Sequence, residues 1–426
     1  MKHLHHLSPG ARQQRGAAAL VVTTLLFFVM VLVTLFVNRN LVFEQRASAN
    51  QYRATQAFEA AEAGAEWALA QLNQPQRIGP DCLASPDSSA TSFRNRYLSQ
   101  TGATITPRTW VNGAIATPLQ PTCVRSSAGW ACTCPANSAA VPSAPEGDGP
   151  FPAFSLQFMA SDKPGTLRVL ATGCTRLAGE CLTGSTSNVD ATARVDVTLG
   201  LLAGLRTPPA AALTTRGSID ADGAAFGAHN ADPATGLALH AGASIAAGNA
   251  RLSTPAGAPL AGAALSQDAG LAALSADRFF ASYFGLDKAR WKAQLAVTRL
   301  ACGSDCAAAI AAAAAGTDGS ALIWIDGDLA LDGPATIGTI ERPVVLVVEG
   351  TARLRGAVAF HGLLYGSTLN WTDTAAPGAV LRGAALSEND YTGNGTPDLV
   401  YDSGVLTKLK TRSGSFARIN GGWRDF

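Results

Sequence analysis

The chain has 426 residues, a formal net charge of +1 and only 15% charged residues. This near-neutral balance gives no support to a nucleic-acid or acidic-lipid partner, which a basic surface would recognise. The 43 glycines and the scarcity of charges favour thin, tightly turning β-structure over a charge-rich helical protein. The length allows two or three domains.

The first apolar segment runs from Ala17 to Val37 and contains no charged residue. As a helix it spans roughly 31 Å, which matches the hydrocarbon core of a bilayer. The preceding residues 1–16, MKHLHHLSPGARQQRG, carry Lys and Arg but no acid. The positive-inside rule therefore predicts a single-pass inner-membrane protein with a cytoplasmic N-terminus and a periplasmic C-terminal region.

A cleavable secretory signal is the alternative for this segment. Such a signal has a shorter apolar core, and small residues follow that core at the cleavage site. Here the core is long and is followed by NRNLVFEQR, whereas the small residues Gly16, Ala17, Ala18 and Ala19 stand at its start. This order argues for an apolar helix that is retained.

A short basic leader that ends in glycine, followed by a retained apolar helix, resembles the precursors of the type IV pilin superfamily. The resemblance covers about residues 10–73 and extends to the PilX-like minor pilins through the stretch EQRASANQYRATQAFEAAEAGAEWAL. The Glu/Ala-rich helix of that family is matched at Phe58, Ala60, Ala61, Glu62 and Ala63. The resemblance implies that a prepilin peptidase cuts after Gly16, so that Ala17 becomes the mature N-terminus.

One position departs from the pilin pattern. Most pilins carry a glutamate at the fifth mature position, where it meets the N-terminal amine of a neighbouring subunit, but here that position is Val21. A carboxylate in the membrane is costly unless it is paired. PilX-like minor pilins and the K-type pseudopilins of type II secretion also tend to lack it. Val21 therefore favours a minor, initiating or tip subunit over the main filament subunit.

The N-terminal helix, residues 17–73, is predicted to continue past the membrane until Pro75 prevents its extension. Helical spacing places several apolar residues on one face, namely Phe58, Ala61, Ala65, Leu69 and Leu72. Phe58 and Trp67 are interpreted as core residues between the helix and the domain that follows. Packing against neighbouring subunits is the alternative.

Residues 74–204 are predicted to form a disulfide-containing α+β domain. The segments DKPGTLRVLATG and ATARVDVTLGLL alternate apolar and polar residues, as half-buried strands do. The pilin resemblance implies that such strands belong to a small antiparallel sheet.

The chain has eight cysteines, all of them after the apolar segment. They favour disulfides in an oxidising compartment over zinc, because the two-residue gaps of a zinc knuckle are missing. Close spacing predicts the pairs Cys174–Cys181 and Cys302–Cys306. The other four are expected to pair among themselves in an order that the sequence does not fix: Cys82, Cys123, Cys132 and Cys134.

Residues 205–426 contain short alternating runs that end in glycine, such as ALIWIDGDLALDGPATIG and PVVLVVEGTARLRGAVAFHGLLYG. These runs predict stacked coils, as in a parallel β-helix or similar solenoid, with a β-sandwich as the alternative. The predicted fold class is therefore α+β: a long pilin-type helix with a small antiparallel sheet, followed by a mainly-β domain.

A helical insert is predicted within this domain at about residues 269–316. Its aromatic residues are expected to cap or flank the solenoid, and a carbohydrate- or partner-binding platform is the alternative: Phe279, Phe280, Tyr283, Phe284 and Trp291. The ending GGWRDF resembles the C-terminal segment of PilX-like proteins that carry such an added domain. Trp423 and Phe426 in this segment are expected to have a packing role and no other.

The chain offers few candidates for a catalytic or metal site. No P-loop, G-x-S-x-G or H-E-x-x-H motif is present, so neither an enzyme nor a cofactor is predicted. The stretch SENDYTGNGTPD could hold calcium through Glu388, Asp390, Asn394 and Asp398, although a polar turn explains it as well. The histidines after the leader are isolated in Gly-rich sequence and are expected at the surface or in turns: His229, His240 and His361.

The resemblance implies a non-enzymatic minor pilin that takes part in priming and biogenesis of a type IV pilus. Its expected partners are other minor pilins, the major pilin, the inner-membrane assembly platform, prepilin peptidase and a large tip adhesin. A pilus-associated adhesin or surface-binding module that presents the solenoid is the alternative. A membrane-anchored polysaccharide-active enzyme is the third hypothesis, for which the sequence shows no clear cluster of acids.

Overall fold

The computed structural model describes residues 15–113, 115–137, 142–143, 145, 151–177, 191–221, 223–303, 305–372 and 378–425. The chain divides into two compact units, residues 1–56 and 57–426, each of which is described by itself. A long N-terminal helix precedes a strand-rich remainder, so the predicted α+β class is confirmed.

Helix α1 runs from Arg15 to Asn73 and ends where Pro75 was expected to stop it. Between Ala17 and Ala63 the sequence contains neither glycine nor proline, so nothing in this stretch interrupts the backbone hydrogen bonds of the helix. The part of α1 in the first unit is exposed from Gly16 to Thr55.

The second unit begins with the end of α1 and a six-stranded antiparallel sheet in the order β26-β9-β8-β7-β5-β6. Its strands are β5 (Thr122–Ser126), β6 (Gly129–Thr133), β7 (Ala153–Ala160), β8 (Thr166–Cys174), β9 (Thr192–Ala203) and β26 (Gly414–Asp425). The two segments with an alternating pattern are β8 and β9, so both predicted strands are confirmed.

The end of α1 packs closely on this sheet through small side chains. The buried stripe of the helix contains Gly64 and the apolar residues Ala57, Ala60, Ala61, Ala65, Ala68 and Leu72. A Cβ on Gly173 of β8 would lie 2.1 Å from the carbonyl oxygen of Ala57, so only glycine fits at this contact. The buried face is therefore rotated from the predicted one, and Phe58 and Leu69 lie at its margin, partly buried.

Short elements surround the sheet. They are helix α2 (Phe93–Tyr97) and two hairpins, β1 (Leu98–Thr101) with β2 (Thr104–Pro107) and β3 (Thr109–Asn112) with β4 (Ile115–Pro118). Phe93 and Tyr97 are buried, and Trp67 of α1 lies 5.3 Å from the Phe93 ring. Trp67, like Phe58, is partly buried and packs against the core between the helix and the domain that follows.

A second sheet contains the sixteen strands between β9 and β26. The first group comprises β10 (Ala211–Thr215), β11 (Ile219–Asp220), β12 (Gly227–His229), β13 (Leu237–Ala241), β14 (Ile245–Ala246), β15 (Arg251–Ser253) and β16 (Ala264–Leu265). The second comprises β17 (Val297–Ala301), β18 (Ala321–Asp326), β19 (Leu329–Asp332), β20 (Ala335–Ile337), β21 (Val344–Arg355), β22 (Val358–Thr372), β23 (Val380–Ser387), β24 (Tyr391–Thr392) and β25 (Asp398–Tyr401).

Among the described residues, every pairing in this second sheet is parallel. Parallel pairing of successive strands is what stacked coils require, whereas the strands of a β-sandwich pair antiparallel. The structure therefore favours the solenoid-like prediction over its alternative.

The strands of this sheet stack out of sequence order, as β17-β18-β21-β22-β23-β10-β13-β16. Strand β10 lies between β23 and β13, with Leu213 aligned to Ala385 on one side and Leu239 on the other. The coils that come first in the sequence, which begin with β10, are therefore stacked on β23, the last long strand of the coils that come later.

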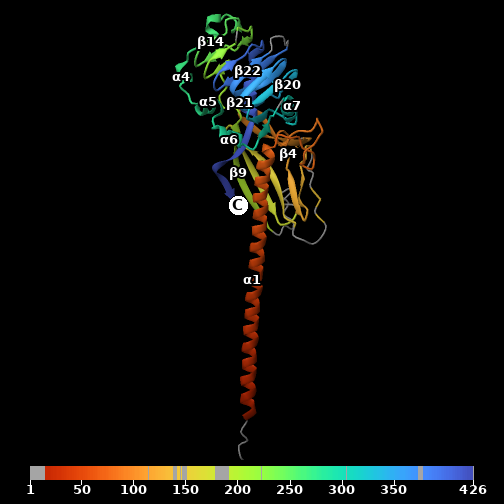
Figure 1. Ribbon diagram of the computed structural model, residues 1–426. Coiled ribbons are helices and arrows are strands. Elements are labelled where there is room, and N and C mark those ends of the chain that lie inside the picture. Colours follow the sequence, from red (N-terminus) through yellow and green to blue (C-terminus); the bar gives the residue numbers. More distant parts are fainter. Residues whose placement is uncertain are drawn as a thin grey trace, which may run out of the picture. The chain divides into compact units, whose positions relative to one another are not determined.

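Three short helices carry the chain from one end of this stack to the other: α4 (Ala269–Ala272), α5 (Ala276–Phe284) and α6 (Lys288–Lys292). Figure 1 shows α5 and α6 beside the stacked strands. The ring of Phe280 lies 5.0 Å from that of Tyr365 on β22, and the ring of Trp291 lies 6.1 Å from that of Trp324 on β18. The aromatic group therefore flanks the strands, which is one of the two predicted placements.

The structure corrects two predicted boundaries. The insert at 269–316 is not continuous, because β17 begins the parallel stack within it, before helix α7 (Ala307–Ala315). The domain at 205–426 is too long, because β26 leaves it, after helix α8 (Ser403–Arg412), and pairs antiparallel with β9. This pairing buries Phe416 in the core beneath the antiparallel sheet. The parallel domain is thus inserted between β9 and β26.

Candidate membrane anchor and processing site

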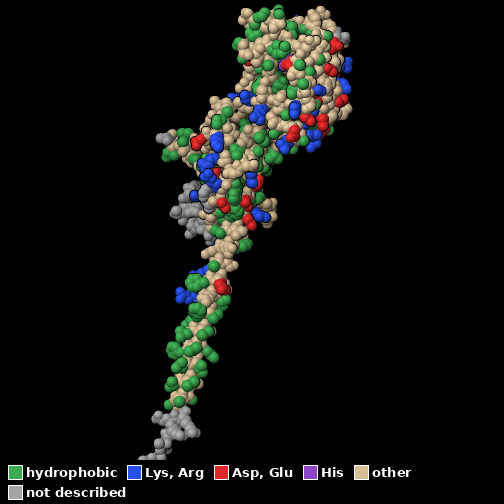
Figure 2. Space-filling model, turned by 90° about the vertical axis from the view of Figure 1, so that its left-hand side faces the viewer, with side chains coloured by type: hydrophobic (Ala, Val, Ile, Leu, Met, Phe, Trp, Pro, Cys, Tyr) green, Lys and Arg blue, Asp and Glu red, His purple; other side chains and the backbone are tan. Residues whose placement is uncertain are grey.

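Helix α1 exposes a continuous apolar surface near its N-terminus. Leu20, Phe28 and Phe36 are 68%, 64% and 67% exposed, and the helix is long and apolar enough to cross a membrane. Figure 2 shows hydrophobic side chains covering this part of the helix. An exposed apolar surface of this size marks a contact with lipid or with other proteins.

The polar side chains within this surface are satisfied by the helix itself. The hydroxyl of Thr24 donates to the carbonyl oxygen of Leu20 at 2.7 Å, and that of Thr23 donates to the same oxygen at 3.0 Å. The Thr34 hydroxyl donates to the carbonyl oxygen of Met30. These bonds leave no threonine hydroxyl to be desolvated without a partner, which is what a bilayer demands.

The first charged side chains after the apolar run begin at Arg39. Its guanidinium carbon lies 5.5 Å from the centre of the Phe43 ring, and Glu44 and Arg46 follow in the next turn. A cation held over an aromatic ring suits the boundary between acyl chains and headgroups. The end of the anchor at Val37 stays a prediction.

The predicted processing residues, Gly16 and Ala17, lie in the first turn of α1, and both are exposed. No heavy atom outside the local helix lies within 4 Å of a Cβ built on Gly16. Residues 1–14 of the leader lie outside the described residues. Val21, one turn further on, is 58% exposed and belongs to the apolar surface.

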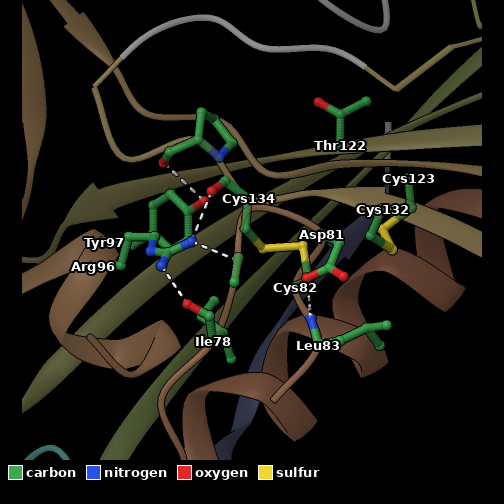
Figure 3. Close-up of a disulfide and its surroundings, with 12 residues drawn as sticks. Ile78, Asp81, Cys82, Leu83, Arg96, Tyr97, Thr122, Cys123, Cys132 and Cys134 are labelled. Atoms are coloured by element: carbon green, nitrogen blue, oxygen red, sulfur yellow. Dashed lines mark hydrogen bonds between the residues drawn. A yellow bond between two sulfur atoms is a disulfide. The ribbon is translucent and has the colours of Figure 1, made fainter. Parts of the chain in front are cut away.

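Two disulfides lie at the antiparallel sheet, one between loop segments and one between the paired strands β5 and β6, and they resolve the pairing that the sequence left open. Cys82 bonds to Cys134, and Cys123 bonds to Cys132. Figure 3 shows the guanidinium group of Arg96 beside the first of them, donating hydrogen bonds to the carbonyl oxygens of Ile78, Gly79 and Cys134. One arginine thus ties together the two loop segments that this disulfide joins.

The remaining cysteines follow the predicted spacing where they are described. Cys302 bonds to Cys306. Cys174 is disulfide-bonded as well, but its predicted partner Cys181 lies outside the described residues. The pair Cys174–Cys181 therefore stays a prediction.

The four candidate calcium ligands lie in the parallel domain, and the three carboxylates among them already have partners. Glu388 is buried and accepts hydrogen bonds from the Tyr365 hydroxyl and the Lys288 ammonium. Asp390 accepts from the backbone N–H of Ser218 at 2.7 Å, and Asp398 pairs with Arg251 at 2.7 Å. Within the described part of the chain, no group of three or more His, Cys, Asp or Glu is arranged so that it could hold a metal ion.

The three histidines lie on separate strands of the parallel domain. In His229, Nδ1 lies 2.9 Å from Ser253 Oγ on the neighbouring coil, and in His240, Nε2 lies 2.7 Å from Asp268 Oδ2. Burial lowers the pKa of His361 below its ordinary value. The first two histidines therefore cross-link adjacent segments of the stack.

Asn73 and Arg94 join α1 to the C-terminal strand, and no sequence pattern singled them out. The Asn73 side chain donates to the carbonyl oxygen of Phe416 at 2.9 Å and accepts from its N–H at 2.7 Å. Arg94 donates to the carbonyl oxygens of Leu72 and Gly414. An asparagine two residues before a proline signals the end of a helix, but no local pattern reveals a partner so distant in the sequence.

Comparisons with known proteins find a family match for the N-terminal segment alone. No curated protein matches the chain. A solved structure, the competence-associated pilin ComZ from Thermus thermophilus, aligns with 88% of this chain and 97% of its own at 12% identity and a TM-score of 0.20, which is too low to support an argument. Residues 15–66 match the PilX N-terminal family. Through that segment, which contains the apolar part of α1, the chain is similar to the PilX-like members of the type IV pilin superfamily.

Proposed function

We propose that the chain is a minor pilin, an assembly or tip subunit that takes part in priming a type IV pilus. It is held in the inner membrane by α1, with its N-terminus in the cytoplasm and its C-terminal region in the periplasm, and then moves into the pilus tip. The observation that carries the proposal is the exposed apolar helix within the PilX-type segment. Its hydroxyls are satisfied within the helix, so lipid and neighbouring helices can cover it equally well.

The apolar surface of α1 would be covered by lipid in the membrane and by neighbouring helices in the pilus. A helix that leaves the bilayer without a new apolar partner would expose a long apolar surface to water. Other minor pilins and the major pilin, each with a comparable helix, are the expected partners. Val21 brings no carboxylate into that bundle, so the fifth mature position has no acidic side chain to pair with a neighbouring subunit's amine.

Three further partners belong to the proposal. Prepilin peptidase would remove residues 1–16, the inner-membrane assembly platform would extract the mature subunit, and a large tip adhesin would join it. The disulfides outside the membrane segment suit the oxidising periplasm in which the second unit would fold.

Maturation provides the direct test. In cells with active prepilin peptidase, we expect intact mass and N-terminal sequencing to give a mature protein that begins at Ala17. Gly16→Leu should abolish the cut, because a bulky side chain replaces the glycine that ends the leader, and the full-length form should accumulate as it does without the peptidase.

Gly10→Leu is the matched control, since it adds the same side chain within the same leader and should leave processing unchanged. A mature protein that begins beyond Val37 would mean that α1 is a cleaved signal. A wild-type protein that keeps Met1 despite active peptidase would contradict the proposal too.

One observation favours a second candidate function, that of a pilus-associated adhesin. The parallel domain is an insertion, because the backbone N–H of Gly204 lies 3.2 Å from the carbonyl oxygen of Ser413, where the chain leaves and rejoins the antiparallel sheet. A domain attached in this way can be presented to a surface without contributing to the pilin-like sheet.

A further inference from the structure

A cavity of about 860 Å³ lies in the second unit, where α2, the β1–β2 hairpin and the end of α8 meet. Its described lining contains four arginines, namely Arg94, Arg96, Arg108 and Arg412, and a single acid, Asp318. In a chain with 15% charged residues, four arginines around one cavity form a concentrated positive charge.

Two of these arginines are fixed parts of the wall. Arg94 and Arg96 donate their hydrogen bonds to backbone carbonyl oxygens, which carry no formal charge. Burial lowers the pKa of Arg94 to about 10, which leaves it protonated at neutral pH. Their positive charges therefore persist beside the cavity.

The other two arginines keep donors free at the rim. Arg108 and Arg412 are exposed, and Arg108 uses only Nε, which donates to the carbonyl oxygen of Leu98 at 3.1 Å. Within the described part of the chain, Arg412 makes no side-chain hydrogen bond or ion pair. Both guanidinium groups can accept a new partner.

The nearby acids are already engaged. The carboxylate of Asp318 accepts hydrogen bonds from the Ser92 N–H at 2.8 Å and the Asn95 side chain at 3.0 Å. The Glu341 carboxylate pairs with Lys408 at 2.9 Å, and the pKa of Glu341 is lowered mainly by Lys408 and less by Arg412. Among the described residues, none of the four arginines has an ion-pair partner, so an anion from outside would relieve their mutual repulsion.

The rest of the lining indicates what kind of anion fits. Leu98, Ile105 and Leu119 belong to the lining but are buried, so polar side chains such as Ser99, Gln100 and Thr109 form the open wall between the arginines. The Phe416 ring is 2% exposed and lies under the Arg94 guanidinium at 4.8 Å, so it offers no open face to a sugar ring. The volume suits a ligand of several residues rather than one small ion.

We propose that this cavity binds an acidic peptide segment of a partner protein. Its carboxylates would meet the planar, fork-shaped guanidinium groups of Arg108 and Arg412, which match a carboxylate with two parallel hydrogen bonds. Its backbone would meet the polar side chains of Ser99, Gln100 and Thr109. This inference rests on the second unit alone and holds whether or not the chain is a pilus subunit.

The test uses the full chain in a non-ionic detergent and calorimetric titration. The probe is an eight-residue peptide that alternates glutamate with valine, compared with its lysine–valine counterpart, a trigalacturonate and inorganic phosphate. We expect only the acidic peptide to bind appreciably. The double variant Arg108→Gln/Arg412→Gln should weaken that binding about tenfold or more, because it removes both rim charges.

The double variant Arg278→Gln/Arg290→Gln is the matched control, since both residues are exposed, lie outside the cavity and lose the same charge. Its affinity for the peptide should equal that of the wild type. Thermal unfolding checks that both variants fold. As a measurement that needs no variant, raising the salt concentration should weaken binding to the wild type.

Absence of peptide binding would overturn the proposal, and so would equal binding by the rim and control variants. Tighter binding of trigalacturonate would replace the peptide with an acidic polysaccharide. Phosphate binding with the same affinity as the peptide would reduce the cavity to a site for small anions.

Discussion

Asn73 is the last residue of α1, and its side chain occupies both backbone hydrogen-bonding groups of Phe416 on β26. Both residues are buried, so Asn73→Ala would leave a donor and an acceptor without partners. Each costs about 1–3 kcal/mol. We expect the free energy of unfolding to fall by about 2–4 kcal/mol, measured by urea denaturation of the solubilised full chain.

Asn420→Ala on the same strand is the control, because Asn420 is exposed. It should change stability by less than about 0.5 kcal/mol. Equal stability of the two variants would show that the link between α1 and β26 contributes nothing. The sequence predicted that the helix ends at Asn73, since Pro75 is a local signal. It could not predict Phe416 as the partner, because that contact exists only once the intervening domain has folded.

The contact between α1 and β8 depends on the absence of side-chain atoms. A Cβ on Gly173 would lie 2.1 Å from the Ala57 carbonyl oxygen and 2.3 Å from the Ala61 nitrogen, both backbone atoms that cannot rotate away. Gly173→Ala must therefore lift the helix from the sheet. We expect a loss of about 3 kcal/mol in the free energy of unfolding, at the upper end for an overpacked core.

Gly248→Ala in the parallel domain provides the comparison, because no atom lies within 4 Å of its added Cβ. Thermal unfolding of the two variants should separate them clearly, with only Gly173→Ala lowering the midpoint. If both melt with the wild type, the close approach of helix and sheet is not as described.

At the level of elements, local sequence patterns were sufficient to predict α1, β8 and β9. Alternation and helix breakers act over a few residues, and these elements obey them. The buried face of α1 was predicted less accurately. Phe58 and Leu69 are hydrophobic and were expected at its centre, but both are only partly buried. The sheet instead selects the alanine stripe, because only small side chains allow the approach that Gly173 permits.

At the level of the molecule, the sequence predicted parallel coils but not their order. Gly-closed runs are local, so stacked strands could be inferred, whereas the junction of β10 with β23 joins segments far apart in the chain. The exit of β26 was missed for the same reason: GSFARINGGWRD resembles the preceding runs until its pairing with β9 is known. Topology of this kind is decided by tertiary contacts, which no local pattern encodes.

The insertion predicts that two deletions of nearly equal size behave differently. Replacing residues 205–412 with a short Gly/Ser linker keeps β26, and the linker spans little, since Gly204 and Ser413 are hydrogen-bonded. Truncation of 205–426 removes β26 together with Phe416, exposes the edge of β9 and uncovers the core that Phe416 helps to fill. We expect the first protein to fold with its disulfides Cys82–Cys134 and Cys123–Cys132, and the second to be degraded.

Limited proteolysis and non-reducing mass analysis measure the folding outcome, and identical behaviour of the two proteins would contradict the insertion. The linker deletion then separates the two candidate functions, because it leaves α1 and the antiparallel sheet in place. If cells carrying it still assemble pili and lose only attachment, the parallel domain acts as an adhesin. If pilus number falls while attachment per pilus is unchanged, the domain contributes to priming, since assembly then depends on contacts that the sheet and helix do not provide.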